Sequence, residues 1–475
     1  MSVNTGLAPE AAALDAPSLD PGRDVETGSF DPVAFATGER HEFKRSRELQ
    51  ARAHDAIPGG CHTLAKGDDQ FPVLAPGFIV RGHGSHVWDA DGNEYIEYGM
   101  GCRAVTLGHG FEPVVEAVRR ELAHGCNFGR PAPIEVECAE AFLACVPQAD
   151  MCKFSKDGST ATTAAIKLAR AHTGRDRIAL CGDHPFFSIH DWFIGTTAID
   201  RGIPDAVKGL TSTFRYNDLA SLRALFERHP NEIAAVILEP AKYDEPQDGF
   251  LHAARDLAHA HGALFILDEM ITGFRWAAGG AQSVYDITPD LSTFGKALAN
   301  GFSVSALAGR RELMELAGLR TQEERVFLMS TTHGAETHAL AAAIATMRIY
   351  AQEPVVETLR ARGERLRGGI EAAAVRHGVE DHVKVVGPPQ CMVLVHLDRD
   401  GNSSQAMRTL MMQEQIRHGV IAPSLVTSYS HSVDDIDATV EAMDRALAVY
   451  ARGLADGPER HLVGRPTRVV YRKHN

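Results

Sequence analysis

Lys296 is the first residue whose surroundings raise a chemical question. It stands in the stretch STFGKALANGF, residues 292–302, among small and apolar neighbours and close to Gly295 and Gly301. A lysine normally lies in water, so this stretch alone favours an ordinary surface lysine beside a turn. The alternative is a lysine held in a pocket, where desolvation lowers its pKa and makes its amine a nucleophile.

Two carboxylates stand at the ends of apolar runs elsewhere in the chain. Glu239 ends AAVILEP and Asp268 ends ALFILDEM, and Lys296 follows Asp268 after a further short run, PDLSTFG. A strand buried on both faces brings its terminal carboxylate to the rim of a sheet. Either carboxylate alone could be a helix cap. An aspartate and a lysine on neighbouring strand ends indicate a shared site.

Pyridoxal phosphate chemistry needs this pair of groups. The cofactor takes an amine to form its Schiff base, and an acid facing its pyridine nitrogen favours the protonated ring. It also needs a site for its phosphate. KDGSTATT places Gly158, Ser159 and Thr160 at the start of a helix, where free N–H groups and hydroxyls favour an anion. Taken alone this stretch is also an ordinary N-cap, and it lacks the GK[ST] ending of a P-loop.

The elements that must position these groups alternate between strands and helices. Apolar segments such as RIALCGD, IAAVILEP and ALFILDEM alternate with amphipathic segments such as LASLRALFERHP and LHAARDLAHAHG. The alternation predicts an α/β domain with a doubly wound, largely parallel sheet over residues 105–345. In such sheets the functional groups gather at the carboxyl ends of the strands.

The flanking regions have a different character. Residues 41–104 combine a polar helix with strands around an Asp91-Gly92 turn, and residues 346–475 look like an α+β unit with long helices. We expect them to be the N-terminal and C-terminal parts of a smaller domain. Residues 1–40, rich in Ala, Pro, Asp and Gly, are expected to be a flexible tail.

Composition excludes several classes of partner. The chain has 475 residues, which predicts two or more domains, and its net charge of 48 − 62 = −14 argues against nucleic acid and anionic membranes. Eight cysteines without a CxxC pair, and histidines without a ligand spacing, predict no metal site and a reducing, cytoplasmic location. No secretory signal and no run long enough to span a membrane stand out.

The longest patterned stretch carries a family resemblance. LDEMITGFRWAAGGAQSVYDITPDLSTFGKALANG, with KDGSTATTAAIKLARAHTGRDRI, VILEP and STTHGAETHALAAA, resembles the class III, fold-type I pyridoxal-phosphate aminotransferases. Within them it is most similar to the glutamate-1-semialdehyde 2,1-aminomutase-like branch. The resemblance implies that Lys296 forms the Schiff base and carries the proton, and that Asp268 pairs with the pyridine nitrogen. It also implies that Gly158 and Ser159 hold the phosphate.

The resemblance implies three further roles. Thr331, in STTHG, matches a threonine that reaches the phosphate of the neighbouring subunit, so a homodimer with sites at its interface is expected. Phe186 falls near the ring-stacking aromatic, although the family usually has Tyr-His there, and Phe187 or His184 could take this role instead. Glu239 matches a glutamate that supports the cofactor's surroundings, with a structural cap as the alternative.

The chain departs from the aminomutase where that enzyme holds its substrate. Lys66 stands where the aminomutase has an arginine for the substrate carboxylate, and lysine cannot make the planar two-bond contact of arginine. Thr427 stands where it has a gating glutamate. Arg130, in NFGRPAP, is an alternative anion-binding candidate or an ordinary surface arginine.

These observations lead to three hypotheses. The first is an aminotransferase, in which an amino-acid donor leaves as a keto acid and an aldehyde or ketone takes the amine. Similar members of the branch suggest a sugar-like or specialised-metabolite acceptor. The second is an intramolecular 2,1-aminomutase, which needs the same residues. The third is a binding or regulatory protein with this fold, and the intact pair of Lys296 and Asp268 argues against it.

Overall fold

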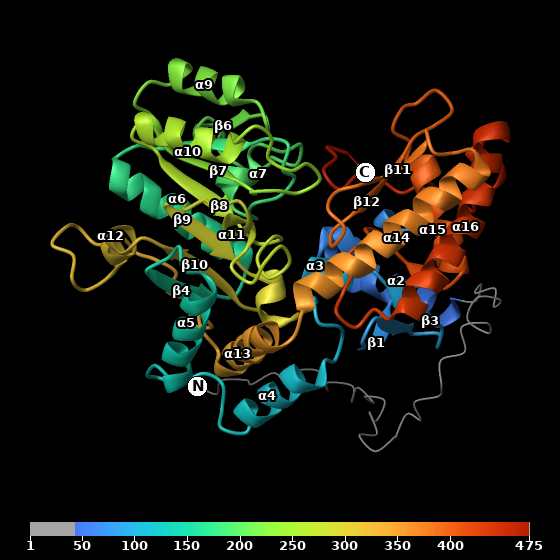
Figure 1. The fold of residues 1–475 in the computed structure, drawn as a ribbon, viewed down its shortest axis with the longest axis horizontal. Coiled ribbons are helices and arrows are strands. Elements are labelled where there is room, and N and C mark those ends of the chain that lie inside the picture. The colour runs from blue at the N-terminus through green and yellow to red at the C-terminus, as the bar shows by residue number, and fades with distance from the viewer. Residues whose placement is uncertain (1–42, 475) are drawn as a thin grey trace, which may run out of the picture.

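The structure, a computed structural model, describes residues 43–474 (Figure 1). The tail expected over residues 1–40 lies outside the described residues. Figure 1 shows a large sheet with its helices on one side of the molecule, and a second group of long helices with small sheets on the other.

Seven strands form the large sheet, in the order β4-β10-β9-β8-β7-β5-β6. β10 runs antiparallel to both of its neighbours, β4 and β9, and the other pairings are parallel. The prediction of a largely parallel α/β sheet is confirmed, and the reversed β10 is the feature that the alternation of segments did not reveal. The strands are β4 (Met151–Ser155), β5 (Arg177–Cys181), β6 (Thr211–Phe214), β7 (Ile233–Leu238), β8 (Leu264–Asp268), β9 (Leu291–Phe294) and β10 (Ser305–Gly309).

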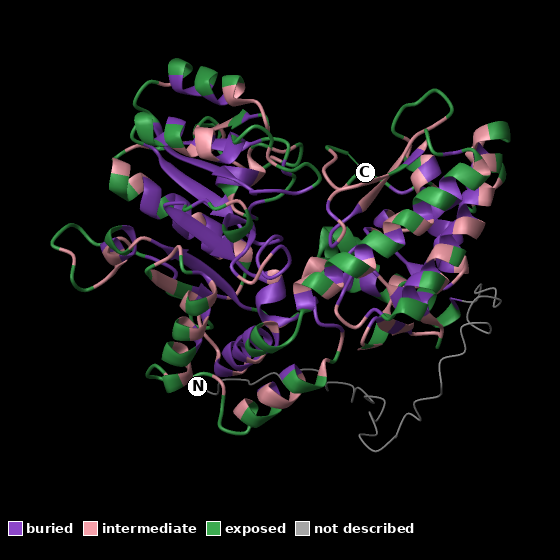
Figure 2. Cartoon of the chain, in the orientation of Figure 1, coloured by how far each residue is buried: buried purple, intermediate pink, exposed green. Residues whose placement is uncertain are grey.

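Helices cover both faces of this sheet, so its central strands β7 and β8 are buried (Figure 2). Successive side chains of β8 point to opposite faces: Ile266 joins the core beneath α6, whereas Phe265 and Leu267 join the core of α9 and α10. The helices of this part are α4 (Glu112–Leu122), α5 (Pro133–Cys145), α6 (Gly158–Thr173), α7 (Asp191–Ile194), α8 (Asp205–Lys208), α9 (Leu219–Arg228), α10 (Phe250–Ala260), α11 (Ala281–Val284), α12 (Arg311–Met314) and α13 (Thr337–Gln352).

The N-terminal and C-terminal parts of the described chain meet in a second sheet, of order β1-β2-β3-β13, in which β13 pairs parallel with β3. This pairing supports the proposal that residues 41–104 and 346–475 form one smaller domain, although α13 crosses the expected boundary at 345. Its elements are α2 (Lys44–Ala56), β1 (Ile79–His83), β2 (His86–Asp89), β3 (Glu94–Glu97), α3 (Met100–Arg103), α14 (Val355–His377), β11 (Val383–Val386), β12 (Val393–His396), α15 (Gln405–Arg417), β13 (Val420–Ile421) and α16 (Val433–Asp456).

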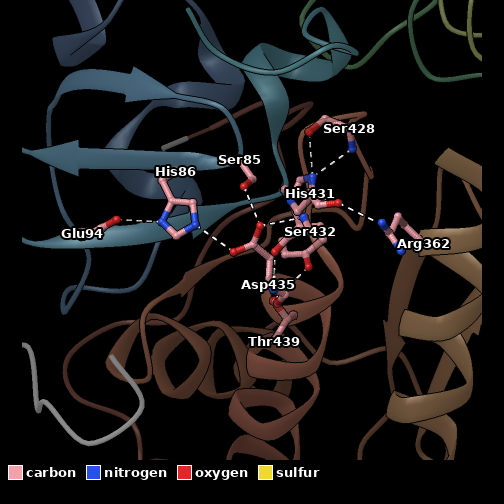
Figure 3. Close-up of polar contacts among 10 residues, drawn as sticks. Ser85, His86, Glu94, Arg362, Ser428, His431, Ser432, Asp435 and Thr439 are labelled. Atoms are coloured by element: carbon pink, nitrogen blue, oxygen red, sulfur yellow. Dashed lines mark hydrogen bonds and ion pairs between the residues drawn. The ribbon is translucent and has the colours of Figure 1, made fainter. Parts of the chain in front are cut away.

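A group of buried and half-buried polar side chains links this sheet to α16 (Figure 3). It consists of Ser85, His86, Glu94, Ser432 and Asp435 and is called the His86 cluster. His86 Nε2 lies 2.9 Å from Asp435 Oδ1 and His86 Nδ1 lies 2.8 Å from Glu94 Oε1. Ser85 Oγ and the Ser432 backbone N donate to Asp435 Oδ2, at 2.9 and 2.8 Å. Burial acts to lower the pKa of His86, but Asp435 and Glu94 outweigh it and raise the pKa to about 9. The imidazole is therefore a paired cation that links β2 and β3 to α16.

Within residues 43–474 there is no helix long and apolar enough to cross a membrane, and no group of three His, Cys, Asp or Glu that could hold a metal ion. All eight cysteines are free thiols.

Candidate active site

Lys296 lies two residues after the end of β9, at the first position of the 3₁₀ helix η4 (Lys296–Ala299). Its φ of 45° is in the left-handed region that non-glycine residues seldom adopt, so the surrounding structure must hold it there. Its side chain is half-buried, whereas Gly295 before it is buried. Burial lowers the pKa of Lys296, and the charges of Asp268 and Glu239 oppose this only in part. The amine therefore loses its proton more readily than a surface lysine does, as a Schiff-base lysine must.

Asp268 ends β8, where its cross-strand partner on β9 is Thr293. The carboxylate is 3% exposed, and its Oδ1 accepts hydrogen bonds from Thr293 Oγ1 and the Met270 backbone N, each at 3.0 Å. Oδ2 accepts no hydrogen bond from a described residue. Burial and the nearby Glu239 charge raise the pKa of Asp268 to about 7. A cation bound beside this carboxyl group would lower its pKa and favour the ionised form.

The pairing of β8 with β9 brings Asp268 and Lys296 to one edge of the sheet, close enough for each charge to shift the pKa of the other. The start of α6 at Gly158 lies close to the same edge of the sheet. A Cβ on Gly158 would lie 2.8 Å from Met270 Sδ, and a Cβ on Gly295 would lie 2.7 Å from the same atom. Gly158, at the candidate phosphate site, and Gly295, beside Lys296, therefore both pack against Met270, which is two residues after Asp268.

Glu239 follows β7 and is held by two groups of its own chain. Lys242 Nζ lies 2.6 Å from Glu239 Oε1, and the Glu239 backbone N donates to His184 Nδ1 at 3.1 Å. Burial raises the pKa of Glu239, but Lys242 and His184 outweigh it and leave the group ionised. Glu239 Oε2 is buried without a partner among the described residues. Sequence reasoning missed Lys242, whose only signal was a lysine three positions beyond a strand-end glutamate.

The start of α6 has the geometry of an anion site. Asp157 is the N-cap and its side chain accepts from the Thr160 backbone N at 2.9 Å. The N–H groups of Gly158 and Ser159, at the first two helical positions, have no partner inside the helix. Ser159 Oγ accepts from the Ile189 backbone N at 3.0 Å, so its own proton remains free to donate. These donors and the helix dipole favour a phosphate.

Among the three aromatic candidates, Phe186 is the one with a free face. It is 43% exposed and contacts Phe193 edge-on at a centroid distance of 5.7 Å. Phe187 is 2% exposed and packs in the core against the same Phe193, and His184 is buried against Glu239. The environment favours Phe186 for stacking, and its role remains a prediction.

Three other candidate residues, Thr331, Lys66 and Arg130, are exposed, and Thr427 is buried. Thr331 lies on an exposed loop whose Thr332 carbonyl accepts from Asn127 Nδ2 at 3.1 Å. Lys66 and Arg130 are exposed and form no ion pair or side-chain hydrogen bond with a described residue, and their role in binding substrate stays a prediction. Thr427 is buried and donates to the Leu359 carbonyl at 2.9 Å, which is a contact inside the smaller domain.

These residues fit pyridoxal phosphate. The site offers an amine of lowered pKa, a carboxyl group with a free oxygen, and donors for a phosphate at a helix start. Glycine at 158 and at 295 lets the backbone approach Met270 closely.

The chain is similar to known proteins over most of its length. The family model for class-III aminotransferases matches residues 65–447. A glutamate-1-semialdehyde 2,1-aminomutase of Desulfatibacillum aliphaticivorans is 33% identical over 436 residues, covering 85% of this chain and 99% of that protein. A 3-aminobutyryl-CoA aminotransferase of Cloacimonas acidaminovorans is 31% identical, covering 86% and 98%.

Solved structures show the same fold. The FumI protein of Sphingopyxis sp. MTA144, in its PLP internal aldimine form, superposes with a TM-score of 0.80 at 32% identity, covering 87% of this chain and 98% of that one. An omega-transaminase from Sphaerobacter thermophilus gives 0.77 at 28% identity, covering 86% and 98%. The chain therefore belongs to the class-III aminotransferases, fold-type I enzymes that use pyridoxal 5'-phosphate.

Proposed function

We propose that this chain is an aminotransferase that moves an amino group from an amino-acid donor to an aldehyde or ketone acceptor. The observation that carries the proposal is the pair of Lys296 and Asp268 on neighbouring strand ends, with the pKa of the amine lowered and that of the acid raised. A site with this pattern holds both groups away from their ordinary protonation states, as acid–base chemistry near neutral pH requires.

In this proposal each residue of the site has a separate role. Pyridoxal phosphate, when bound, supplies a carbonyl for amines and a ring that withdraws electrons. Lys296 would hold the cofactor and, once released by the substrate amine, move a proton with its Nζ. Asp268 would keep the ring nitrogen protonated, and Gly158 and Ser159 would hold the phosphate.

An intramolecular aminomutase is the second candidate, and the name of the Desulfatibacillum relative supports it. The name of the Cloacimonas relative supports transfer. The change at Lys66 favours transfer, because the aminomutase-like branch places an arginine there for the substrate carboxylate. We also propose a sugar-like or specialised-metabolite acceptor.

We further propose a homodimer in which Thr331 reaches the partner's phosphate site. Its exposure within one chain supports this, because a residue that completes a second copy's site must be free of its own core. The free cysteines support a reducing, cytoplasmic location.

The test follows the visible absorption of the cofactor-loaded protein while single amino donors are added. Bleaching by one donor, with a stoichiometric release of its keto acid, is the result expected of a transaminase. Rearrangement of glutamate 1-semialdehyde without any added donor or acceptor would support the mutase instead. A protein that stays colourless with excess cofactor would contradict both.

A further inference from the structure

The turn that carries Arg103 is strained. Met100, Gly101, Cys102 and Arg103 all have positive φ, of 42°, 59°, 58° and 70°. Three of these residues have side chains, and such residues seldom adopt left-handed backbone, least of all in succession. Strain of this kind persists only where the surroundings fix it, and it gathers at functional sites.

One support of this turn comes from the segment after Asp268. Arg275 is fully buried, and its Nη2 donates to the Arg103 carbonyl at 2.7 Å while its Nη1 donates to the Ile271 carbonyl. Ile271 is three residues beyond Asp268. The guanidinium of Arg275 thus fixes the backbone of Arg103 against the loop that follows β8.

A second support comes from the loop of Lys296. Asn300 Oδ1 accepts from the backbone N of Thr106 and of Leu107, at 3.0 and 2.9 Å, and Asn300 Nδ2 donates to the Gly108 carbonyl at 3.0 Å. A Cγ atom of Val105 lies 3.2 Å from the Cβ position of Gly301. The segment that follows the turn of Arg103 is therefore hydrogen-bonded to the loop of Lys296.

The side chain of Arg103 has polar neighbours but no charged hydrogen-bond partner among the described residues. Its Nε is buried and unpaired, and its guanidinium donates to the Cys391 thiol, a weak acceptor. Burial lowers the pKa of Arg103, but Cys391, Tyr243 and Glu239 outweigh it and raise the pKa above its ordinary value. The Arg103 charge in turn helps to lower the pKa of Lys296, so the two cations are close enough to interact.

Arg275 shows what a structural arginine looks like in the same region. Its Nε is also buried without a partner, but both of its terminal nitrogens donate to backbone carbonyls, which no side-chain nitrogen of Arg103 does among the described residues. A cation left without such partners is costly in a protein interior unless a ligand supplies them. The planar fork of an arginine matches the two oxygens of a carboxylate.

We propose that Arg103 binds the carboxylate of the amino donor, so that its fork orients the amino acid toward Lys296. This inference rests on the proposed aminotransferase function and names a residue that sequence reasoning did not select. Lys66 and Arg130, the two candidates that it did select, are exposed and form no side-chain hydrogen bond or ion pair with a described residue.

The experiment compares two donors that differ only in the carboxylate: the amino acid that bleaches the holoenzyme, and the amine left by its decarboxylation. For Arg103→Gln we expect the KM of the amino acid to rise at least tenfold, while the rate with the amine is unchanged. Arg103→Lys should recover part of the loss, because it keeps the charge without the fork. Arg399→Gln, at an exposed turn, is the matched control and should behave as the wild type.

The outcomes separate the two proposals. Equal losses with both donors would make Arg103 a structural residue and overturn the inference, and so would an unchanged KM. A loss confined to the acceptor half-reaction would place the bound anion on the acceptor and overturn the donor assignment. A wild-type holoenzyme that no amino acid bleaches would remove the aminotransferase proposal itself, and the Arg103 inference with it.

Discussion

The His86 cluster and the Lys296 site bury carboxylates to the same depth, but they pair them differently. Asp435 is 4% exposed and Asp268 is 3% exposed. Asp435 uses both oxygens, one toward His86 and one toward Ser85 and the Ser432 backbone, and these partners lower its pKa well below its ordinary value. Asp268 uses one oxygen, and its pKa rises to about 7.

The difference shows that partners, rather than burial, decide the charge state of a buried carboxyl group. The His86 cluster is complete within one chain, so its charges stabilise the fold. In the Lys296 site, the pKa of Asp268 is raised and that of Lys296 is lowered, so both groups favour their neutral forms. A bound ligand would supply the partners that these groups lack within the chain. The following substitutions test this contrast.

Lys296→Ala should have the largest effect. It removes the nucleophile and the proton carrier together, so the donor half-reaction should slow by at least about 10²–10⁴-fold. The bleaching rate and the released keto acid measure this. Lys384→Ala, at an exposed position of β11, should keep the wild-type rate, and a Lys296→Ala protein that also kept it would contradict the site.

Asp268→Asn should slow the same reaction by about 10²–10³-fold, because it removes a charge aimed at the ring nitrogen but keeps a similar shape. Asp268→Glu, which keeps the carboxylate, should lose less. Equal rates for Asp268→Asn and the wild type would show that the carboxylate does not act on the ring.

The same carboxyl group predicts a pH effect on the cofactor-free protein. The pKa of Asp268 is raised from 3.8 to about 7, so the folded state binds more protons than the unfolded state between these values. Stability should therefore fall as the pH rises through this range, by up to about 4 kcal/mol. Urea unfolding at several pH values measures it. Asp268→Asn should flatten that slope, and an equally steep slope in the variant would contradict the assignment.

The His86 cluster predicts a loss of stability in the alkaline range instead. The pKa of His86 is raised from 6.5 to about 9, so its contribution is fully present below pH 6.5 and is lost as the pH rises through 9. The expected loss is up to about 3 kcal/mol in unfolding free energy. His86→Gln should remove this dependence, whereas His124→Gln, at an exposed site, should not. If both variants kept the wild-type slope, His86 would not be a paired cation.

Thr331→Ala should have the smallest effect, about tenfold weaker cofactor binding, because one hydrogen bond to a charged phosphate is lost. Thr332→Ala, in the same loop, is the control, since its contact with Asn127 uses the backbone carbonyl. In a mixed dimer of Thr331→Ala with Lys296→Ala, the site that keeps Lys296 should bind cofactor with wild-type affinity. Weak binding there would place Thr331 in its own subunit's site.

Local patterns made the centre of the site predictable. Glu239 and Asp268 each end an apolar run, and Lys296 stands between two glycines, so sequence neighbours alone mark them as strand-end groups. The phosphate candidates at the start of α6 were predictable for the same reason, because a helix start has a local signature.

Contacts between distant residues were not predictable. His86 and Asp435 are separated by 349 positions, and no sequence pattern in either segment predicts that the two are in contact. The antiparallel direction of β10 could not be predicted, because a short apolar run does not show which way its strand runs in the sheet. The left-handed turn at Arg103 depends on Arg275 and Asn300, which only the folded chain brings to it.

The most direct test of the central claim is to locate the cofactor on the chain. Borohydride reduction of the holoenzyme fixes a Schiff base as a stable amine, and mass spectrometry of the peptides then finds the modified lysine. We predict the added pyridoxyl-phosphate mass on the peptide containing Lys296 and on no other. Modification of another lysine, such as Lys242, or of none, would contradict the account of this site.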